Sequence, residues 1–285
     1  MVIYMLVRRV VIPMGSVVSV PFNVAGSDPA TRERAGRIGS ADTSAAKVLV
    51  MLDAFRGPKG VLGVTELARA VGVPKSTAHR LLSIMVEGGF VRKIDSRYCL
   101  TERLFEVGNR AGSTAIRSTG LRRRAMPYLT ELYTGSRGTV HLATLSGTDV
   151  LYLEKLFGHD TACASTTVGA RRPAHATALG KAMLAYSPDA QVELMTGAPL
   201  RRFTARTLHT TAQLEQELER VRDDGVAYDD GELQEGLQCI AVPIFDVSTG
   251  IPVAAVSVSS FRSQTLNRYA SQLLSMSRDL SRGAA

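Results

Sequence analysis

Five polar and basic residues lie at the start of one predicted helix: Lys75, Ser76, Thr77, His79 and Arg80. Pro74 precedes them, and proline suits the first turn of a helix because its missing amide hydrogen is not needed there. Hydroxyl groups and backbone amides at a helix start can hold phosphates, and arginine or histidine can reach base edges. The pattern is typical of a helix that enters the major groove of DNA by its N-terminus.

The same helix has a predicted buried face. Its apolar residues recur at the spacing of one helical stripe: Ala78, Leu81, Leu82 and Met85. The opposite face carries Ser76, His79, Arg80 and Ser83. Two alternatives stand beside DNA binding, since Arg80 could brace neighbouring helices, and the whole segment could be a helical subdomain with a solvated basic face.

The flanking segments complete a recognisable unit. A shorter helix begins near Thr65, which we expect to cap it and to contact DNA, and Gly72 supplies the turn between the helices. After Gly88-Gly89, the sequence FVRKIDSRYCLT predicts two short strands around Asp95-Ser96. This hairpin could reach flanking phosphates or a minor groove through its three basic residues, Arg92, Lys93 and Arg97. Helix, turn, helix and basic hairpin together predict a winged helix-turn-helix.

A second candidate site lies in the back half of the chain. In VGARRPAHATALGKAML, a loop with Gly, Pro and His runs into a helix start near Thr177, whose free amides can attract a carboxylate or phosphate. Further on, an acidic turn precedes Cys239, and Ser257 and Ser259 alternate with valines, so both hydroxyls lie on one strand face. Buried hydroxyls need partners. A small polar ligand is one candidate partner, and water or backbone is the other.

The elements that position these residues mix helices and strands. Asp42 or Thr43 is expected to cap a first helix, whose apolar stripe is Ala45, Val48, Leu49, Leu52 and Phe55. In the back half, strands are expected within 139–156 around Ser146-Gly147, and at 226–233, 239–246 and 251–261. Helices are expected at 178–187, at 211–225 with Thr210 or Thr211 as cap, and at 265–281. Clustered strands with long helices favour an α+β fold with a GAF-like sensor layer.

Charge divides the 285 residues into two unlike parts. Residues 1–137 hold 21 Lys and Arg against 10 Asp and Glu, whereas residues 138–285 hold 13 against 16. A basic front half is typical of a module that binds a polyanion, although chance and solubility could also produce it. The three cysteines (Cys99, Cys163 and Cys239) stand far apart, which fits a reducing cytoplasm. No apolar run approaches the ~20 residues of a membrane span, so we expect a cytoplasmic protein without a membrane partner.

These observations predict four parts. Residues 1–40 are expected to be a disordered or miscalled N-terminal extension, and residues 41–101 a winged helix-turn-helix DNA-binding domain. Residues 102–137 should form a linker helix and connector, and residues 138–285 an effector-binding domain. The arginine run at 122–124 could assist DNA binding, but a solvated face is the commoner meaning of such a run.

Two rival functions rest on other residues. An enzyme could use Cys239 as a nucleophile with His175 or His209, but there is no G-x-S-x-G motif, and Lys181 is followed by Ala182 instead of the Ser or Thr of a P-loop. A thiol- or metal-responsive regulator could use Cys239, or a cluster of His141, His159, Cys163 and His175, whose spacing matches no ligand motif. We therefore expect no catalytic residue, no metal and no cofactor.

Three passages, in order, give the chain a family resemblance. They are TELARAVGVPKSTAHRLLSIMVEGGFVRK with SRYCLT, then GARRPAHATALGKAMLA, then RDDGVAYDDGE with GLQCIAVPIFD and AAVSVSS. With them the chain resembles the IclR family of bacterial transcription regulators over roughly residues 42–281. The resemblance implies a winged helix-turn-helix, a linker helix and an α+β effector domain. It also implies dimers, or dimers of dimers, on double-stranded pseudo-palindromic operators, with small metabolites, often carboxylates, as effectors and with repression as the commoner outcome.

The resemblance also implies an effector pocket. By position it falls on Ala178 and Leu179 in the helix-start loop, Asp229 in the acidic turn, Cys239, Ser257 and Ser259. The loop amides would hold the carboxylate of the effector, and the side chains would bind its other oxygens. One departure from the family pattern is Thr101, where a glycine commonly follows the leucine at the end of the wing.

Overall fold

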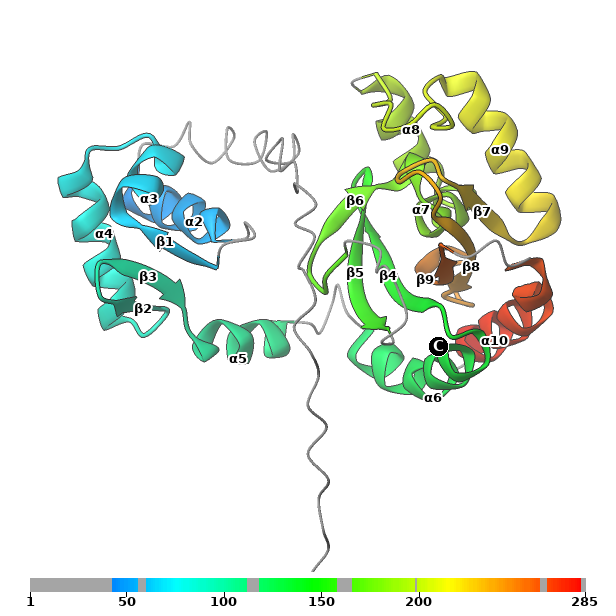
Figure 1. The fold of residues 1–285 in the computed structure, drawn as a ribbon, viewed down its shortest axis with the longest axis horizontal. Coiled ribbons are helices and arrows are strands. Elements are labelled where there is room, and N and C mark those ends of the chain that lie inside the picture. Colours follow the sequence, from blue (N-terminus) through cyan, green and yellow to red (C-terminus); the bar gives the residue numbers. More distant parts are fainter. Residues whose placement is uncertain are drawn as a thin grey trace, which may run out of the picture. The chain divides into compact units, whose positions relative to one another are not determined.

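The structure is a computed structural model that describes residues 43–55, 60–111, 118–157, 166–197, 199–261 and 266–282. The chain folds as two compact units that divide between Gly108 and Asn109 (Figure 1). The prediction for residues 1–40 lies outside the described residues. In the part of the chain that the structure describes, no helix is both long and apolar enough to cross a bilayer.

Unit 1 is a winged helix-turn-helix, as predicted. Its helices are α2 (Ser44–Ala54), α3 (Val64–Val71) and α4 (Lys75–Glu87), followed by α5 (Glu102–Ala111), which runs across the unit boundary. Its strands are β1 (Val61–Gly63), β2 (Val91–Ile94) and β3 (Arg97–Leu100), paired antiparallel in the order β1-β3-β2. Thr43 caps α2 by accepting a hydrogen bond from the amide of Ala46, and Gly72 ends α3 in the left-handed region that favours glycine.

The core of unit 1 confirms the helical face predicted for α4 and corrects two details. All four predicted residues of that face are buried, at 3% exposure or less. In α2 the predicted stripe is wrong at Ala45 and Leu49, which are exposed, because the helix turns Met51 and Val50 inward instead. The cap predicted at Thr65 is also wrong. The cap of α3 lies two residues earlier, at Gly63, and the Glu66 carboxylate accepts from the Gly63 amide at 2.9 Å.

Unit 2 is built on one antiparallel sheet of six strands in the order β6-β5-β4-β9-β8-β7. The strands are β4 (Thr139–Ser146), β5 (Asp149–Leu156), β6 (Arg171–Pro173), β7 (Ala227–Asp230), β8 (Gln238–Phe245) and β9 (Pro252–Ser260). The helices are α6 (Ser118–Ser136), α7 (Ala178–Leu184), α8 (Pro188–Thr196), α9 (Thr211–Asp224) and α10 (Ala270–Arg282), with short 3-10 turns at Ala174–Ala176 and Leu266–Tyr269. The α+β prediction is confirmed, whereas β1, β6 and α8 were missed.

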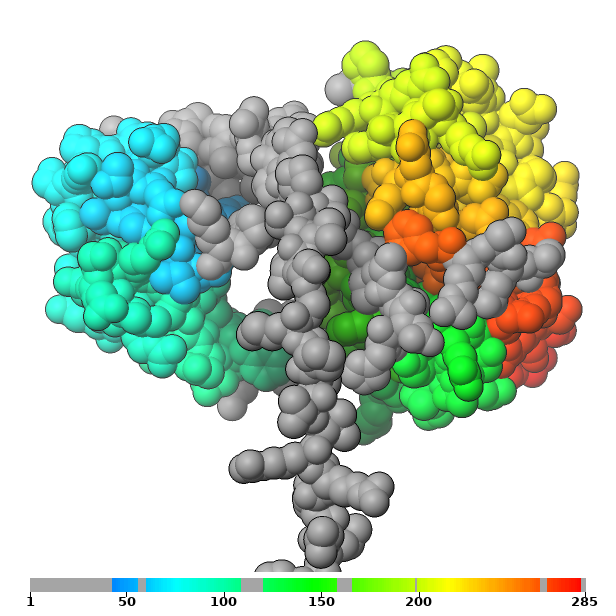
Figure 2. Space-filling view, viewed as in Figure 1, coloured from blue at the N-terminus to red at the C-terminus, as the bar shows by residue number. Residues whose placement is uncertain are grey.

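Helices cover both faces of this sheet, so its strands alternate between two cores (Figure 1). Helices α6 and α10 pack on one face, where the apolar cluster includes Val140, Ile240, Val256 and Val258. Helices α7 and α9 pack on the other face, where the side chains are small, including Ala143, Ala227, Ala241 and Ala255. Small residues leave room on that face, and the candidate ligand site lies there. In the space-filling view, α9 (yellow) borders the segment of β7 and β8 (orange) on this side of unit 2 (Figure 2).

Candidate functional sites

The start of α4 presents the polar residues predicted to contact DNA. Lys75, Ser76, His79 and Arg80 are exposed, and Thr77 is half-buried. No acidic residue lies in the first turn of α4, so the positive end of the helix dipole and Lys75 act together on an approaching phosphate. Thr65, in the first turn of α3, is exposed as well.

The wing carries its basic residues on exposed positions, but one of them is already paired. Arg92 and Lys93 are exposed on β2, and the Asp95-Ser96 turn joins them to β3, with Asp95 at a φ of 52°. Arg97 donates to the Glu66 carboxylate at 3.1 Å, and this pair ties the wing to α3. Among the described residues, Arg80 makes only a long contact of 3.4 Å with the Ser44 hydroxyl on α2. Arg97 therefore makes the ion pair between the wing and α3, and Arg80 remains exposed to solvent.

The candidate ligand site is a polar row across the helix-covered face of the unit 2 sheet. Asp229, Cys239, Ser259 and Thr139 are successive cross-strand partners on β7, β8, β9 and β4. Asp229, Ser259 and Thr139 are each no more than 4% exposed, and Cys239 is half-buried. The sequence-predicted residues Asp229, Cys239 and Ser259 are thus brought together. Thr139 was missed because it precedes Asp229, the nearest of these partners in the sequence, by 90 residues.

A second row lies two residues along the same strands. Ser257 and His141 are cross-strand partners on β9 and β4, and both are 2% exposed. The Nε2 atom of His141 lies 2.8 Å from the Thr166 hydroxyl, and the ring meets Tyr152 edge-on at 5.0 Å. The Ser257 hydroxyl is buried with no hydrogen-bond partner among the described residues. A buried hydroxyl without a partner indicates a ligand or an ordered water at this position.

Helix α7 places its start over this face. The side chain of Thr177 caps the helix by accepting from the Gly180 amide at 3.0 Å. The Ala178 and Leu179 amides of the first turn have no acceptor within the helix, nor one among the described residues. Both residues are buried in the cluster that also contains Ala241, Ala255 and Cys239. A side chain at Gly180 would lie 2.1 Å from the Ala174 carbonyl oxygen, so only glycine allows this close approach. The structure therefore brings the predicted loop and the serine strand into one cluster.

Burial sets the protonation of the groups in this site. Burial raises the pKa of Asp229 to about 7, against the opposing effects of the Glu232 amide and of Lys181. Burial and then the Asp229 carboxylate raise the pKa of the Cys239 thiol well above its ordinary value. Burial and then Lys155 lower the pKa of His141 to about 3, so the ring is neutral at physiological pH. The site thus offers neutral donors and acceptors, together with a carboxyl group whose protonated form is favoured by burial.

The raised pKa of Cys239 weakens the rival functions that use this thiol. A reactive thiol needs a lowered pKa, which is the reverse of the shift at Cys239. His175 contacts the Arg201 carbonyl oxygen at 3.0 Å, and His209 is exposed with its Nδ1 atom 3.3 Å from the Thr207 carbonyl oxygen. His159 and Cys163 lie outside the described residues. Within the described ranges, no group of three or more His, Cys, Asp and Glu side chains is arranged to hold a metal ion.

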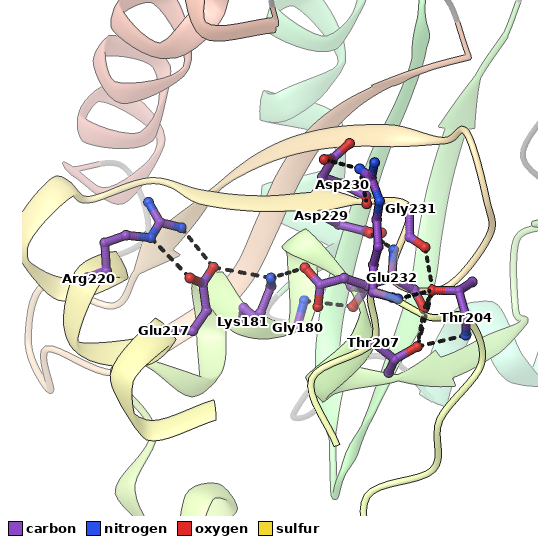
Figure 3. A network of polar contacts seen from close by, with 12 residues as sticks. Gly180, Lys181, Thr204, Thr207, Glu217, Arg220, Asp229, Asp230, Gly231 and Glu232 are labelled. Atoms are coloured by element: carbon purple, nitrogen blue, oxygen red, sulfur yellow. Dashed lines mark hydrogen bonds and ion pairs between the residues drawn. The ribbon is translucent and has the colours of Figure 1, made fainter. Parts of the chain in front are cut away.

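Sequence reasoning also missed a buried ionic network beside the site. Lys181 on α7 is 1% exposed, and its ammonium contacts Glu217 on α9 and Glu232 after β7 (Figure 3). Glu217 also pairs with Arg220 at 2.7 Å. The sequence did signal that Lys181 is buried, because it stands in the middle of the apolar run ALGKAML. A lysine in such a run is either buried with a charged partner or extends its side chain to the solvent.

Comparison with known proteins agrees with the geometry of both units. The family model described as IclR helix-turn-helix domain matches residues 44–95, and the model described as bacterial transcriptional regulator IclR C-terminal matches residues 113–283. The chain belongs to the IclR family. Like its relatives, it is a DNA-binding transcriptional regulator with a C-terminal effector domain.

Two curated relatives show how far the family likeness extends. The HTH-type transcriptional regulator KdgR of Escherichia coli is 33% identical over 246 residues, which covers 84% of this chain and 91% of that protein. The transcriptional repressor IclR of Escherichia coli is 32% identical over 241 residues, covering 81% and 86%. This IclR-family chain therefore shares both of its units with them.

Solved structures give the same result for the fold. An IclR homologue from Microbacterium hydrocarbonoxydans, complexed with 4-hydroxybenzoate, has a TM-score of 0.77 at 28% identity, covering 85% of this chain and 99% of that one. The Thermotoga maritima IclR has a TM-score of 0.64 at 28% identity, covering 90% and 99%.

Proposed function

We propose that this IclR-family chain is a repressor that binds a pseudo-palindromic operator in double-stranded DNA as a homodimer or homotetramer. The observation that carries the proposal is the start of α4, where Lys75, Ser76, His79 and Arg80 are exposed and no acidic residue opposes them. Arg92 and Lys93 on the wing add charge for flanking phosphates. Thr65, Thr77 and Arg97 complete the proposed contact surface. No cofactor is needed for this function.

We further propose that the effector is a small organic acid bound at the helix-covered face of the unit 2 sheet. The Ala178 and Leu179 amides would receive its carboxylate, and Asp229, Cys239, Ser257 and Ser259 would contact its remaining polar atoms. The unpartnered Ser257 hydroxyl supports a ligand here. The raised pKa of Asp229 supports an anionic ligand, because a protonated carboxyl can donate to an oxygen that a carboxylate would repel. The homologue complexed with 4-hydroxybenzoate is a precedent for this chemical class.

Regulation would then follow from linkage between the two sites. An effector alters DNA affinity only if it binds more tightly to one arrangement of the protein than to another. Coupling between sites in allosteric proteins is typically about 5- to 150-fold in affinity. Two recognition helices in a dimer read half-sites about 34 Å apart, or a multiple of that distance, so a modest change of arrangement is enough to weaken binding.

Fluorescence anisotropy with fragments of the DNA upstream of its own gene tests the DNA-binding part. We expect one fragment to bind far more tightly than a scrambled duplex, with affinity that falls steeply as salt is added, because phosphate contacts release counterions. A protein that binds every fragment no better than the scrambled duplex at low ionic strength would refute the proposal.

A further inference from the structure

Lys181 lies beneath the surface between the two halves of the proposed effector site. It is on α7, the helix whose start carries Ala178 and Leu179, and it is 1% exposed. Its Nζ atom lies 3.1 Å from the Glu217 carboxylate on α9 and donates a hydrogen bond to the Glu232 carboxylate in the segment between β7 and β8. Figure 3 shows this ammonium between the two carboxylates, which reach it from opposite sides. A buried cation that joins three elements fixes their relative positions.

The two carboxylates depend on Lys181 to different degrees. Glu217 has a second cation, since Arg220 donates to it from both Nε and Nη2, at 3.0 and 2.7 Å. Burial raises the pKa of Glu217, but its bonds to Arg220 and Lys181 outweigh this and lower it. Glu232 has no second cation among the described residues, its Oε2 atom is buried without a partner, and burial raises its pKa. Glu232 is therefore the group that Lys181 holds in place.

Glu232 in turn orients Asp229. Its backbone amide donates to the Asp229 Oδ1 atom at 2.7 Å. Its carbonyl oxygen accepts from the Thr207 hydroxyl at 2.6 Å, so the backbone on both sides of Glu232 is held. The amide of Glu232 therefore sets the direction of the Asp229 carboxyl, while its side chain is held by Lys181. The chain of contacts thus runs from α7 through Lys181 and Glu232 to Asp229.

We propose that Lys181 is a positioning residue for effector binding, which ties the helix start that receives the carboxylate to the strand end that carries Asp229. This inference rests on the proposed effector site and adds a residue that touches no effector itself. The ammonium makes the two halves of the site move as one body. Without the ammonium, the segment between β7 and β8 loses its ion pair to α7, and this segment opens more readily whether or not Glu232 is charged.

Amide hydrogen exchange on the full chain tests the proposal without any ligand. In Lys181→Met, which keeps the length of the side chain and removes the charge, we expect the Glu232 amide to exchange about tenfold faster or more, because its segment opens locally. The amides of β8 should keep their protection. Arg220→Gln is the matched control, since it removes a cation from the other end of the same network, and exchange at Glu232 should stay as in the wild type. Equal exchange at Glu232 in the wild type and in Lys181→Met would overturn the proposal.

A double variant separates positioning from simple stabilisation. Lys181→Met with Glu232→Gln removes both charges, so thermal stability should recover while the amide at position 232 stays fast and 4-hydroxybenzoate binds about tenfold more weakly than to the wild type. Recovery of slow exchange in the double variant would show that Lys181 only stabilises the fold, and would sink the positioning role. A different pair of results would refute the proposed function instead. If Glu232 exchanges faster in Lys181→Met but the wild-type protein binds neither DNA nor organic acids, then Lys181 does hold the segment between β7 and β8, and the effector site is wrong.

Discussion

Replacing Ser257 by Ala should make the ligand-free protein more stable and the ligand-bound protein harder to form. The hydroxyl is buried, at 2% residue exposure, with no hydrogen-bond partner among the described residues. An unsatisfied buried polar group costs about 1–3 kcal/mol, and removing it returns that free energy to the folded state. The alanine methyl group fills nearly the same space, so the cavity left behind is small.

The size of the effect can be measured by thermal unfolding. For a unit of 150–250 residues, each kcal/mol of unfolding free energy shifts the Tm by about 2–4 °C, so we expect Ser257→Ala to raise the Tm by at least about 2 °C. Isothermal titration with 4-hydroxybenzoate should show the opposite change, with affinity roughly tenfold weaker, because the ligand loses a hydrogen bond and one of its buried polar atoms is left without a partner.

Ser277→Ala is the matched control for this prediction. Ser277 is also a buried serine of unit 2, but its hydroxyl donates to the Pro243 carbonyl oxygen. The same chemical change should therefore lower the Tm there, because it leaves a buried carbonyl oxygen without its partner. If Ser257→Ala lowers the Tm as Ser277→Ala does, then the Ser257 hydroxyl is satisfied in the ligand-free protein, and the argument for a ligand at that position is wrong.

Three further predictions test other parts of the account. Replacing Lys75 or Arg80 by Ala should weaken operator binding and flatten the dependence of log Kd on log salt, because phosphate contacts are removed. Anisotropy titrations at several salt concentrations would measure this slope. Unchanged slopes in both variants would exclude α4 from the interface. Asp229 has a folded-state pKa of about 7 against 3.8 in the unfolded chain, so between these pH values the native state binds one more proton than the unfolded state. The unfolding free energy therefore falls as the pH rises from 4 to 7. Denaturation of Asp229→Asn across that range should show a shallower fall, and a pH profile identical to that of the wild type would contradict the raised pKa. Gly180→Ala should cost about 1–3 kcal/mol in urea unfolding through its clash with the Ala174 carbonyl, whereas Gly135→Ala in α6, where nothing lies within 4 Å, should be neutral or stabilising.

Much of unit 1 could be predicted because its signals are local. The spacing of Ala78, Leu81, Leu82 and Met85 has one helical solution, and all four are buried. The errors at Leu49 and Thr65 have tertiary causes. The sequence of α2 supports two overlapping stripes, and only packing against α3 and α4 selects the one that includes Met51. The start of α3 depends on β1, a strand of three residues with no pattern of its own.

In the candidate site, too, local features could be predicted from the sequence and long-range contacts could not. Alternation along β9 was enough to place Ser257 and Ser259 on one buried face. The partners of those serines come from strands far away in the sequence, and period two cannot say which strand lies beside which. The apolar run around Lys181 signalled its burial, but its partners could not be predicted, since the two carboxylates follow it by 36 and 51 residues and converge only when α9 and the segment after β7 pack on α7. No pattern within a short window contains that information.

The most direct test of the whole account is operator affinity measured with and without the organic acid, in the wild type and in the Ser257→Ala, Ser259→Ala double variant. The account predicts that the acid changes the wild-type Kd for the operator by about 5- to 150-fold. The double variant should bind the operator as tightly as the ligand-free wild type and should not respond to the acid at the same concentration. A double variant that responds as the wild type does would place the effector elsewhere and contradict the account.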